Sequence, residues 1–415
     1  MDTSSAAALI ARNAYGRLVA YLAVRQKDIT AAEDALGDAF LKALQNWPTR
    51  GVPDNPEAWL LVTARRRLID MARRSQTQTK ALALLNLEGY STPTTLNESD
   101  LVFPDERLKL LFICAHPAID DKLHTPLMLQ TVLGLSAAQI ASTFLVAPTT
   151  MGQRLVRAKA KIRDAKIPFE LPGENVLEAR SQAVLQAIYA AYSAGWDSEL
   201  VTTNSGSDLR HSNLTQEAVW LARLCCQLMP DLAEPKGLLA LMLYCESRRA
   251  ARRTRNGAYV PLSEQNTALW SAALIEEAEH ILKQASLKQT VGRFQIEAAI
   301  QSTHARRAIT QATDWQSLAQ LYEGLLQLSP TTGAFLGKAA AIAHINGPTY
   351  SLELLDTLPS QTIRNHQPYW ALRADLLRQS GQFAQATEAY TQAIGLTEDP
   401  AIREFLLSQS QRLNH

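Results

Sequence analysis

The side chains best suited to chemistry in this sequence lie in one short stretch, TMGQRLVRAKAKIRDAK, from residue 150 to residue 166. It contains six basic residues and one acid. Arginine and lysine bind phosphates, and arginine and glutamine also form paired hydrogen bonds with base edges in a DNA groove. The stretch therefore predicts recognition of a nucleic acid rather than the making or breaking of bonds.

The spacing of the apolar residues decides which of these side chains face outward. Apolar residues recur at intervals of four, three and four, as on the buried stripe of an amphipathic helix: Met151, Leu155, Ala158 and Ile162. With this stripe packed inward, the side chains that we predict to contact DNA are Thr149, Thr150, Gln153, Arg154, Arg157 and Lys161. The alternative is an ordinary basic helix on the surface of a bundle.

A second helix is expected directly before this one. Ser136 followed by Gln139 forms a capping box, which marks the start of a helix. Pro148 can occupy the first position of the next helix, where its missing N–H costs no hydrogen bond. Two short helices joined by a tight turn, the second rich in Thr, Gln and Arg, predict a helix-turn-helix.

Another basic cluster lies on a helix expected over residues 57–74, which contains Trp59 and the arginines 65, 66, 67 and 73. The preceding WPTRGVPDNPE is expected to be a rigid, non-helical loop. Arginines beside an aromatic ring suit single-stranded or distorted DNA. The alternative is that Trp59 belongs to the core and that the arginines only solvate the helix.

Composition favours an all-α protein without catalytic residues. Leu, Ala, Gln, Glu and Arg dominate the 415 residues, and runs of alternating β-branched residues are absent. The net charge is +4 over residues 1–170 and −3 over residues 171–415, which hints at nucleic acid meeting the first part. No glycine-rich phosphate loop, H-E-x-x-H or G-x-S-x-G motif occurs. We therefore expect no enzyme activity and no cofactor.

The cysteines and histidines predict neither a disulfide scaffold nor a metal site. Cys114 and His116 could be two ligands of a metal, but two further ligands are missing. The N-terminus lacks the pattern of a signal peptide, and the longest apolar run, GLLALMLYC, is too short to span a bilayer. We expect a cytoplasmic protein that does not enter membranes.

The C-terminal part shows a weak period of 34 residues, as between Ala340 and Ala374 and between Gly347 and Gly381. In the last unit the spacing is that of a tetratricopeptide helix pair: Trp370, Ala374, Gly381, Ala386, Tyr390 and Ala393. A third arginine cluster, in ESRRAARRTRNGAY, is expected to be a solvated helix end, with docking onto an acidic partner as the alternative.

Three segments, AAEDALGDAFLKAL, NPEAWLLVTARRRLIDMARR and GLSAAQIASTFLVAPTTMGQRLVRAKAKIRDAKIPF, resemble extracytoplasmic-function sigma factors of bacterial RNA polymerase. The resemblance is to the subgroup with a long, tetratricopeptide-like C-terminal extension. It implies sigma region 2 in residues 1–75, a linker in 76–105, a region 4 helix-turn-helix in 106–170 and a helical-repeat regulatory domain in 171–415.

The resemblance also implies roles for individual residues. The acidic helix, with Glu33, Asp34 and Asp38, would dock on the clamp helices of the polymerase β′ subunit. The loop and the arginine helix would read and hold the melted −10 element through Asn55, Arg65, Arg66, Arg67 and Arg73. The helix-turn-helix would read the −35 element. Gly37 departs from the glutamine of many relatives and weakens the docking helix, since a mid-helix glycine costs about 1 kcal/mol.

Three functions remain open at this point. The first is a sigma factor that binds core polymerase, directs promoter recognition and melting, and is regulated by its own C-terminal domain, which could also bind a further protein. The second is a DNA-binding regulator that never joins polymerase. The third is a repeat-domain adaptor with a degenerate N-terminal part. The acidic helix and the proline-rich loop favour the first, because a simple repressor needs neither.

Overall fold

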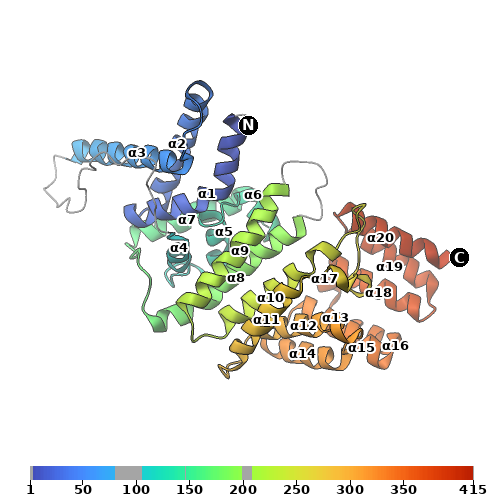
Figure 1. Ribbon diagram of the computed structural model, residues 1–415. Coiled ribbons are helices and arrows are strands. Elements are labelled where there is room, and N and C mark those ends of the chain that lie inside the picture. The colour runs from blue at the N-terminus through green and yellow to red at the C-terminus, as the bar shows by residue number, and fades with distance from the viewer. Residues whose placement is uncertain (1–2, 80–104, 145, 199–207, 415) are drawn as a thin grey trace. The chain divides into compact units, whose positions relative to one another are not determined.

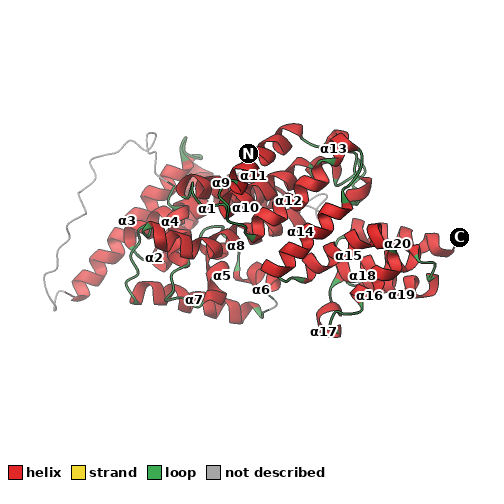
Figure 2. Cartoon of the chain, turned by 90° about the horizontal axis from the view of Figure 1, so that it is seen from below, coloured by secondary structure: helices red, strands yellow, loops and turns green. Residues whose placement is uncertain are grey.

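The computed structural model of the chain describes residues 3–79, 105–144, 146–198 and 208–414. Within these ranges the elements are helices joined by loops, without a β-strand (Figure 2), and Arg253 and Tyr259 form an isolated bridge. The predicted all-α fold is confirmed. The chain divides into two compact units, Met1–Ala191 and Tyr192–His415.

Three helices form the first part of unit 1, which we call the N-terminal lobe: α1 (Thr3–Gln26), α2 (Ile29–Arg50) and α3 (Pro56–Thr79), shown in blue in Figure 1. Helix α1 ends and the chain turns toward α2 at Lys27, whose φ is +56°. Asp28 then caps α2, because its Oδ1 accepts a hydrogen bond from the Ala31 amide at 3.1 Å. The buried seam of α2 consists of small and apolar residues: Ile29, Ala32, Ala35, Leu36, Ala39, Ala43 and Trp47.

The boundaries of two predicted segments were wrong. The helix α2 continues through Pro48 to Arg50, although the sequence predicted a loop from Trp47. Trp47 is buried, and its carbonyl accepts a hydrogen bond from the Gly51 amide at 2.9 Å, so tertiary packing extends the helix to a glycine with φ +82°. Helix α3 likewise continues into the predicted linker. Residues 80–104 of that linker, where the sequence predicts a short helix over 81–87, lie outside the described residues.

Four further helices form what we call the second lobe of unit 1: α4 (Arg107–Cys114), α5 (Asp121–Thr131), α6 (Ala137–Thr143) and α7 (Pro148–Asp164). This lobe packs directly on the N-terminal lobe, with α1 against α4 and α5 and with α2 against α7. The approach is close at Gly16, where an added Cβ would lie 1.9 Å from the carbonyl oxygen of Val132. Any side chain at residue 16 would therefore push the lobes apart. Helix α8 (Glu174–Ser198) begins in unit 1 and ends in unit 2.

Unit 2 continues with two long helices and three 3₁₀ turns: α9 (Asp208–Leu228), α10 (Glu234–Ser247), η2 (Arg249–Ala251), η3 (Leu262–Glu264) and η4 (Thr267–Leu269). Helices α10, α11 and α12 pack closely on one another. The remaining elements are α11 (Ala272–Ser286), α12 (Arg293–Ala305), α13 (Arg307–Thr310), α14 (Trp315–Leu328), α15 (Thr332–Asn346), α16 (Pro348–Leu355), α17 (Ser360–Ile363), α18 (Gln367–Gln379), α19 (Phe383–Gly395), α20 (Pro400–Gln411) and η5 (Arg412–Asn414).

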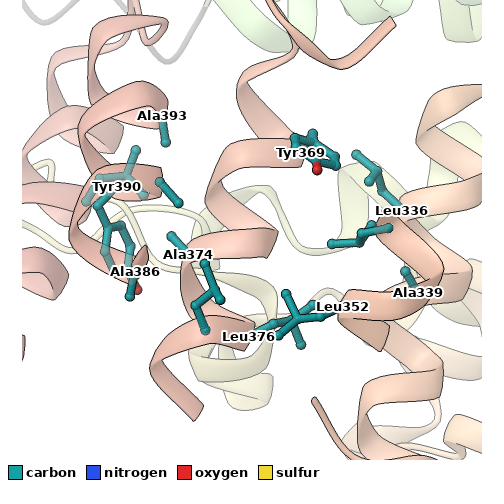
Figure 3. Close-up of a cluster of buried hydrophobic side chains, with 13 residues drawn as sticks. Leu336, Ala339, Leu352, Tyr369, Ala374, Leu376, Ala386, Tyr390 and Ala393 are labelled. Atoms are coloured by element: carbon teal, nitrogen blue, oxygen red, sulfur yellow. The ribbon is translucent and has the colours of Figure 1, made fainter. Parts of the chain in front are cut away.

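The helix pair expected at the C-terminus consists of α18 and α19, which turn at Gly381 with φ +77°. Small residues and two aromatic rings of this pair are buried in a single apolar cluster, with Tyr369 and Ala374 on α18 and Ala386 and Tyr390 on α19 (Figure 3). Leu336 and Leu352 from the preceding helices complete the cluster. The small residues let the two helix backbones approach, and the larger side chains fill the space between neighbouring pairs.

The interpretation of the third arginine cluster as a solvated helix end was wrong. The Arg249 Nε donates to Glu246 at 2.7 Å, and the Arg252 guanidinium lies 3.8 Å from the centre of the Trp196 ring. Arg248 donates to Gln301 on α12. Of the five arginines in this described segment, Arg255 alone is exposed.

Arg253 makes the longest-range contact of this cluster. It donates to Asp399 at 2.6 Å, across 146 residues of sequence. The Asp399 carboxylate also caps α20, because its other oxygen accepts from the Ala401 amide at 2.8 Å. One buried acid therefore fixes both the loop after α10 and the start of α20. The cluster holds unit 2 together and presents little charge to a partner.

A half-buried histidine should make the stability of unit 2 depend on pH. Burial, helped by the charges of Arg248 and Arg307, lowers the pKa of His304 to about 4. The unfolded chain, with a histidine pKa of about 6.5, binds the proton more readily, so stability is complete above that pH and falls as the pH decreases. We expect unfolding to cost about 2 kcal/mol less at pH 5 than at pH 7 through this group.

The measurement is thermal unfolding of the full chain at both pH values. His304→Gln should melt lower than the natural chain at pH 7 but lose less stability on acidification. An equal acid-induced loss in both proteins would contradict the assignment.

Candidate nucleic-acid interface

The turn between α6 and α7 is built as the sequence predicted. Ser136 and Gln139 form the capping box at the start of α6, with the Gln139 Oε1 accepting from the Ser136 amide at 3.0 Å. Ala147 is extended and precedes Pro148 at the first position of α7. The Val146 amide donates to the Ala141 carbonyl at 3.0 Å and closes the turn. Helices α6 and α7 pack on each other, so this turn fixes the direction in which α7 leaves.

The apolar stripe of α7 is buried as expected, at Met151, Leu155, Ala158 and Ile162. Its packing turns the other side of the helix to solvent. The exposed side chains include five of the six predicted DNA contacts: Thr149, Gln153, Arg154, Arg157 and Lys161. Thr150 is half-buried. The result is a basic helix face with donors long enough to reach phosphates and base edges.

Lys159 was not among the residues predicted from the sequence; it lies on α7 but is not available to DNA. Only 7% of its side chain is exposed, and its Nζ donates to the Glu33 carboxylate on α2 at 2.6 Å. Burial raises the pKa of Glu33, and the charge of Lys159 opposes that shift. Lys159 follows Leu155 by four residues, which places it at the edge of the buried stripe. That spacing indicates its burial, but nothing in the sequence indicates a partner 126 residues away.

The three acids expected to dock on polymerase differ in their surroundings. Asp34 is exposed. The Glu33 side chain is 15% exposed because it is paired with Lys159. Asp38 accepts a hydrogen bond from the Arg67 Nε at 2.6 Å and remains half-exposed. The expectation that Glu33 lies on an open surface is therefore wrong for this arrangement, since α7 covers it.

A shallow hollow between α2 and α3 brings the predicted docking and −10 residues together. Asp34 and Asp38 line it from α2, and Arg67 lines it from α3. Leu41 at its edge is 58% exposed. Gly37 also lines the hollow, and an added Cβ there would meet nothing within 4 Å. This surface combines an acid, open space and apolar area, which suits contact with another protein.

The residues predicted for the −10 element are only partly free. The Asn55 Oδ1 accepts a hydrogen bond from the Ala58 amide at 3.0 Å, so the Asn55 side chain caps α3. This oxygen is therefore already engaged within the protein. Arg66 is exposed, Arg65 is half-buried, and Arg67 is paired with Asp38. Arg73 lies on α3, but its side chain is outside the described residues.

Trp59 packs in an aromatic pair, which favours the alternative interpretation that it belongs to the core. Its ring lies 5.5 Å from that of Trp47 at an angle of 63°, which is an edge-to-face contact. Trp47 is buried and Trp59 is half-buried. The pair joins the end of α2 to the start of α3 and so positions the loop of residues 51–55 between them.

Cys114 and His116 have local partners instead of a shared ligand. The Cys114 Sγ lies 3.5 Å from the Thr131 hydroxyl, and burial raises the pKa of its thiol to about 12. The His116 Nδ1 accepts from the Ala118 amide at 3.1 Å. In the part of the chain that the structure describes, no three His, Cys, Asp or Glu side chains gather as metal ligands. No helix among the described residues is long and apolar enough to cross a membrane.

The buried ion pair between α7 and α2 should be sensitive to loss of one partner. Lys159→Met leaves the Glu33 carboxylate buried without a counter-charge, and we expect it to destabilise unit 1 by about 3 kcal/mol. Adding Glu33→Met should recover most of this loss, because an apolar pair of similar volume replaces the ions. The measurement is urea unfolding of the full chain, followed by hydrogen exchange of the α2 and α7 amides.

Lys161→Met is the matched control for this pair. It removes an exposed lysine from the same helix and should change stability by less than about 0.5 kcal/mol. If Lys159→Met costs no more than Lys161→Met, the ion pair contributes nothing to the contact between the lobes.

Comparisons with known proteins agree with this geometry at the N-terminal lobe. Residues 12–78 match the family model of sigma-70 region 2, which covers α1 to α3. Residues 180–286 match a family of unknown function, DUF6596. The fold has no significant match among solved structures.

The chain also has a full-length relative. The uncharacterized protein R00370 of Rhizobium meliloti (strain 1021) is 34% identical over 407 residues, which cover 96% of this chain and 93% of that protein. Similarity over this length extends through both units and the segment that joins them. The chain therefore belongs to the protein family of this rhizobial relative, and its N-terminal lobe is a sigma-70 region 2 domain.

Proposed function

We propose that this protein is an alternative sigma factor of the extracytoplasmic-function type, which directs core RNA polymerase to a set of promoters. A sigma-70 region 2 domain implies binding to core polymerase and promoter DNA, and its family consists of transcription factors rather than enzymes. The observation that carries the more specific proposal is the outward face of α7. A second DNA-binding surface after region 2 is what a two-element promoter requires.

In this proposal the N-terminal lobe has two tasks. The exposed part of α2, around Asp34 and Leu41, docks on the clamp helices of the β′ subunit. The loop of residues 51–55 and the arginines of α3 hold the melted −10 element, with Arg66 free and Arg67 released from Asp38 when DNA binds. The helices α6 and α7 form a helix-turn-helix, and α7 enters the major groove of the −35 element.

The C-terminal unit is proposed to regulate the sigma factor as an attached helical-repeat domain of tetratricopeptide-like architecture. The pairing of α18 with α19 and the shared cluster with the preceding helices support this interpretation. Such a domain also offers a surface for a further protein. The protein would act in the cytoplasm, where polymerase and promoter DNA are found.

The first test asks whether the α7 face contacts DNA within a polymerase complex. Core polymerase with the full chain should produce transcripts from some templates in a genomic promoter pool. Arg154→Ala combined with Arg157→Ala should reduce them by about tenfold or more and lower the salt dependence of promoter binding by about two charges. Run-off transcription and binding at several salt concentrations measure these effects.

Arg255→Ala is the control, since it removes an exposed arginine from unit 2. If the protein binds duplex DNA but core enzyme produces no transcripts with it, the result would instead favour a DNA-binding regulator that acts without polymerase. Neither binding nor transcription would favour the adaptor.

The second test concerns polymerase docking. Asp34→Lys should weaken the binding of the full chain to core polymerase by about tenfold. The proposed partner surface is complementary to an acid, and the lysine would repel its positive charge. Its binding to duplex DNA should not decrease. Binding assays with immobilised core enzyme and with immobilised duplex DNA measure the two affinities separately. Glu170→Lys, a charge reversal at another exposed acid of unit 1, serves as the control. Unchanged core binding by Asp34→Lys would exclude this part of α2 from the docking surface.

A further inference from the structure

One apolar side chain stands among the polar residues on the outer face of α7. Val156 is 63% exposed, although it lies in the middle of the helix. Valine is a poorer helix former than alanine, and so exposed a side chain gains little from burial. Neither the stability of α7 nor its packing on α6 therefore explains this residue.

Val156 lies on the same outward face of α7 as two of the predicted DNA contacts. At 3.6 residues per turn, Val156 points within roughly 60° of Thr149 and Gln153, which precede it by seven and three residues. It lies on the side away from the buried stripe that contains Leu155 and Ala158. Arg157 is its neighbour toward the basic flank and is also exposed.

The exposed methyl groups of Val156 match one apolar group in the major groove of DNA. In the major groove, three of the four bases are read by hydrogen bonds alone, whereas thymine also presents a C5-methyl group. A valine side chain is restricted at χ1 in a helix, so its two methyl groups occupy a fixed position.

We propose that Val156 determines specificity at one thymine of the upstream promoter element, through contact with the C5-methyl group. The inference rests on the proposed function and deepens it. Gln153 and Arg157 supply hydrogen bonds to neighbouring base edges. Val156 adds an apolar contact that distinguishes thymine from the other bases.

The experiment uses the full chain bound to core polymerase. A random duplex library first identifies the preferred upstream motif, and each of its thymines is then replaced singly by uracil, which lacks only the C5-methyl group. For the natural protein, one such replacement should weaken binding about fourfold, equivalent to about 0.8 kcal/mol for one methyl-sized contact. Val156→Ala should bind the thymine duplex about fourfold less well and show no further loss with uracil at that position.

Val291→Ala is the matched control, because Val291 is 71% exposed and lies in unit 2. It should retain the full uracil effect. An undiminished uracil effect in Val156→Ala, or a natural protein that tolerates uracil at every thymine, would overturn the assignment of Val156. A natural protein that selects no upstream motif at all would instead overturn the proposed function, so the two failures are distinguishable.

Discussion

The packing of one apolar stripe on α7 determines the rest of the candidate interface. Met151, Leu155, Ala158 and Ile162 are buried, and their burial leaves the helix no freedom to rotate. Because of that constraint, the side chains of Gln153 and Arg157 point to solvent, and Lys159 is buried at the edge of the stripe. A helix with fewer buried anchors would present the same basic residues without a defined face, and base edges would then be read poorly.

Local chemistry made much of this arrangement predictable. The capping box at Ser136, the proline at the start of α7 and the period of its stripe each act over a few residues, and each is found in the structure. The pair α18 and α19 was predictable for the same reason. Helix ends were less so, because the burial of Trp47 carried α2 past Pro48.

The charged residues were the hardest to interpret from sequence. An arginine looks the same in a sequence whether it is solvated or paired, and its partner decides which. Arg67 meets Asp38 across 29 residues, and Arg253 meets Asp399 across 146. The cluster near residue 250 therefore looked like an exposed basic patch, although most of its charges hold unit 2 together. Asn55 is a similar case, since its role as a cap depends on where α3 begins.

The contact between the two lobes of unit 1 limits what this arrangement can bind. In the proposed function the two lobes bind separate promoter elements, and each base step between these elements adds about 3.4 Å of duplex. The Glu33–Lys159 pair holds the lobes in contact, so reaching two elements further apart than the touching lobes requires this pair to open. In the proposed function, the promoter-competent state is therefore an extended conformer, and the measured promoter affinity equals the intrinsic affinity multiplied by the fraction of molecules in that conformer. Core enzyme that captures α2 would raise this fraction before any base is read.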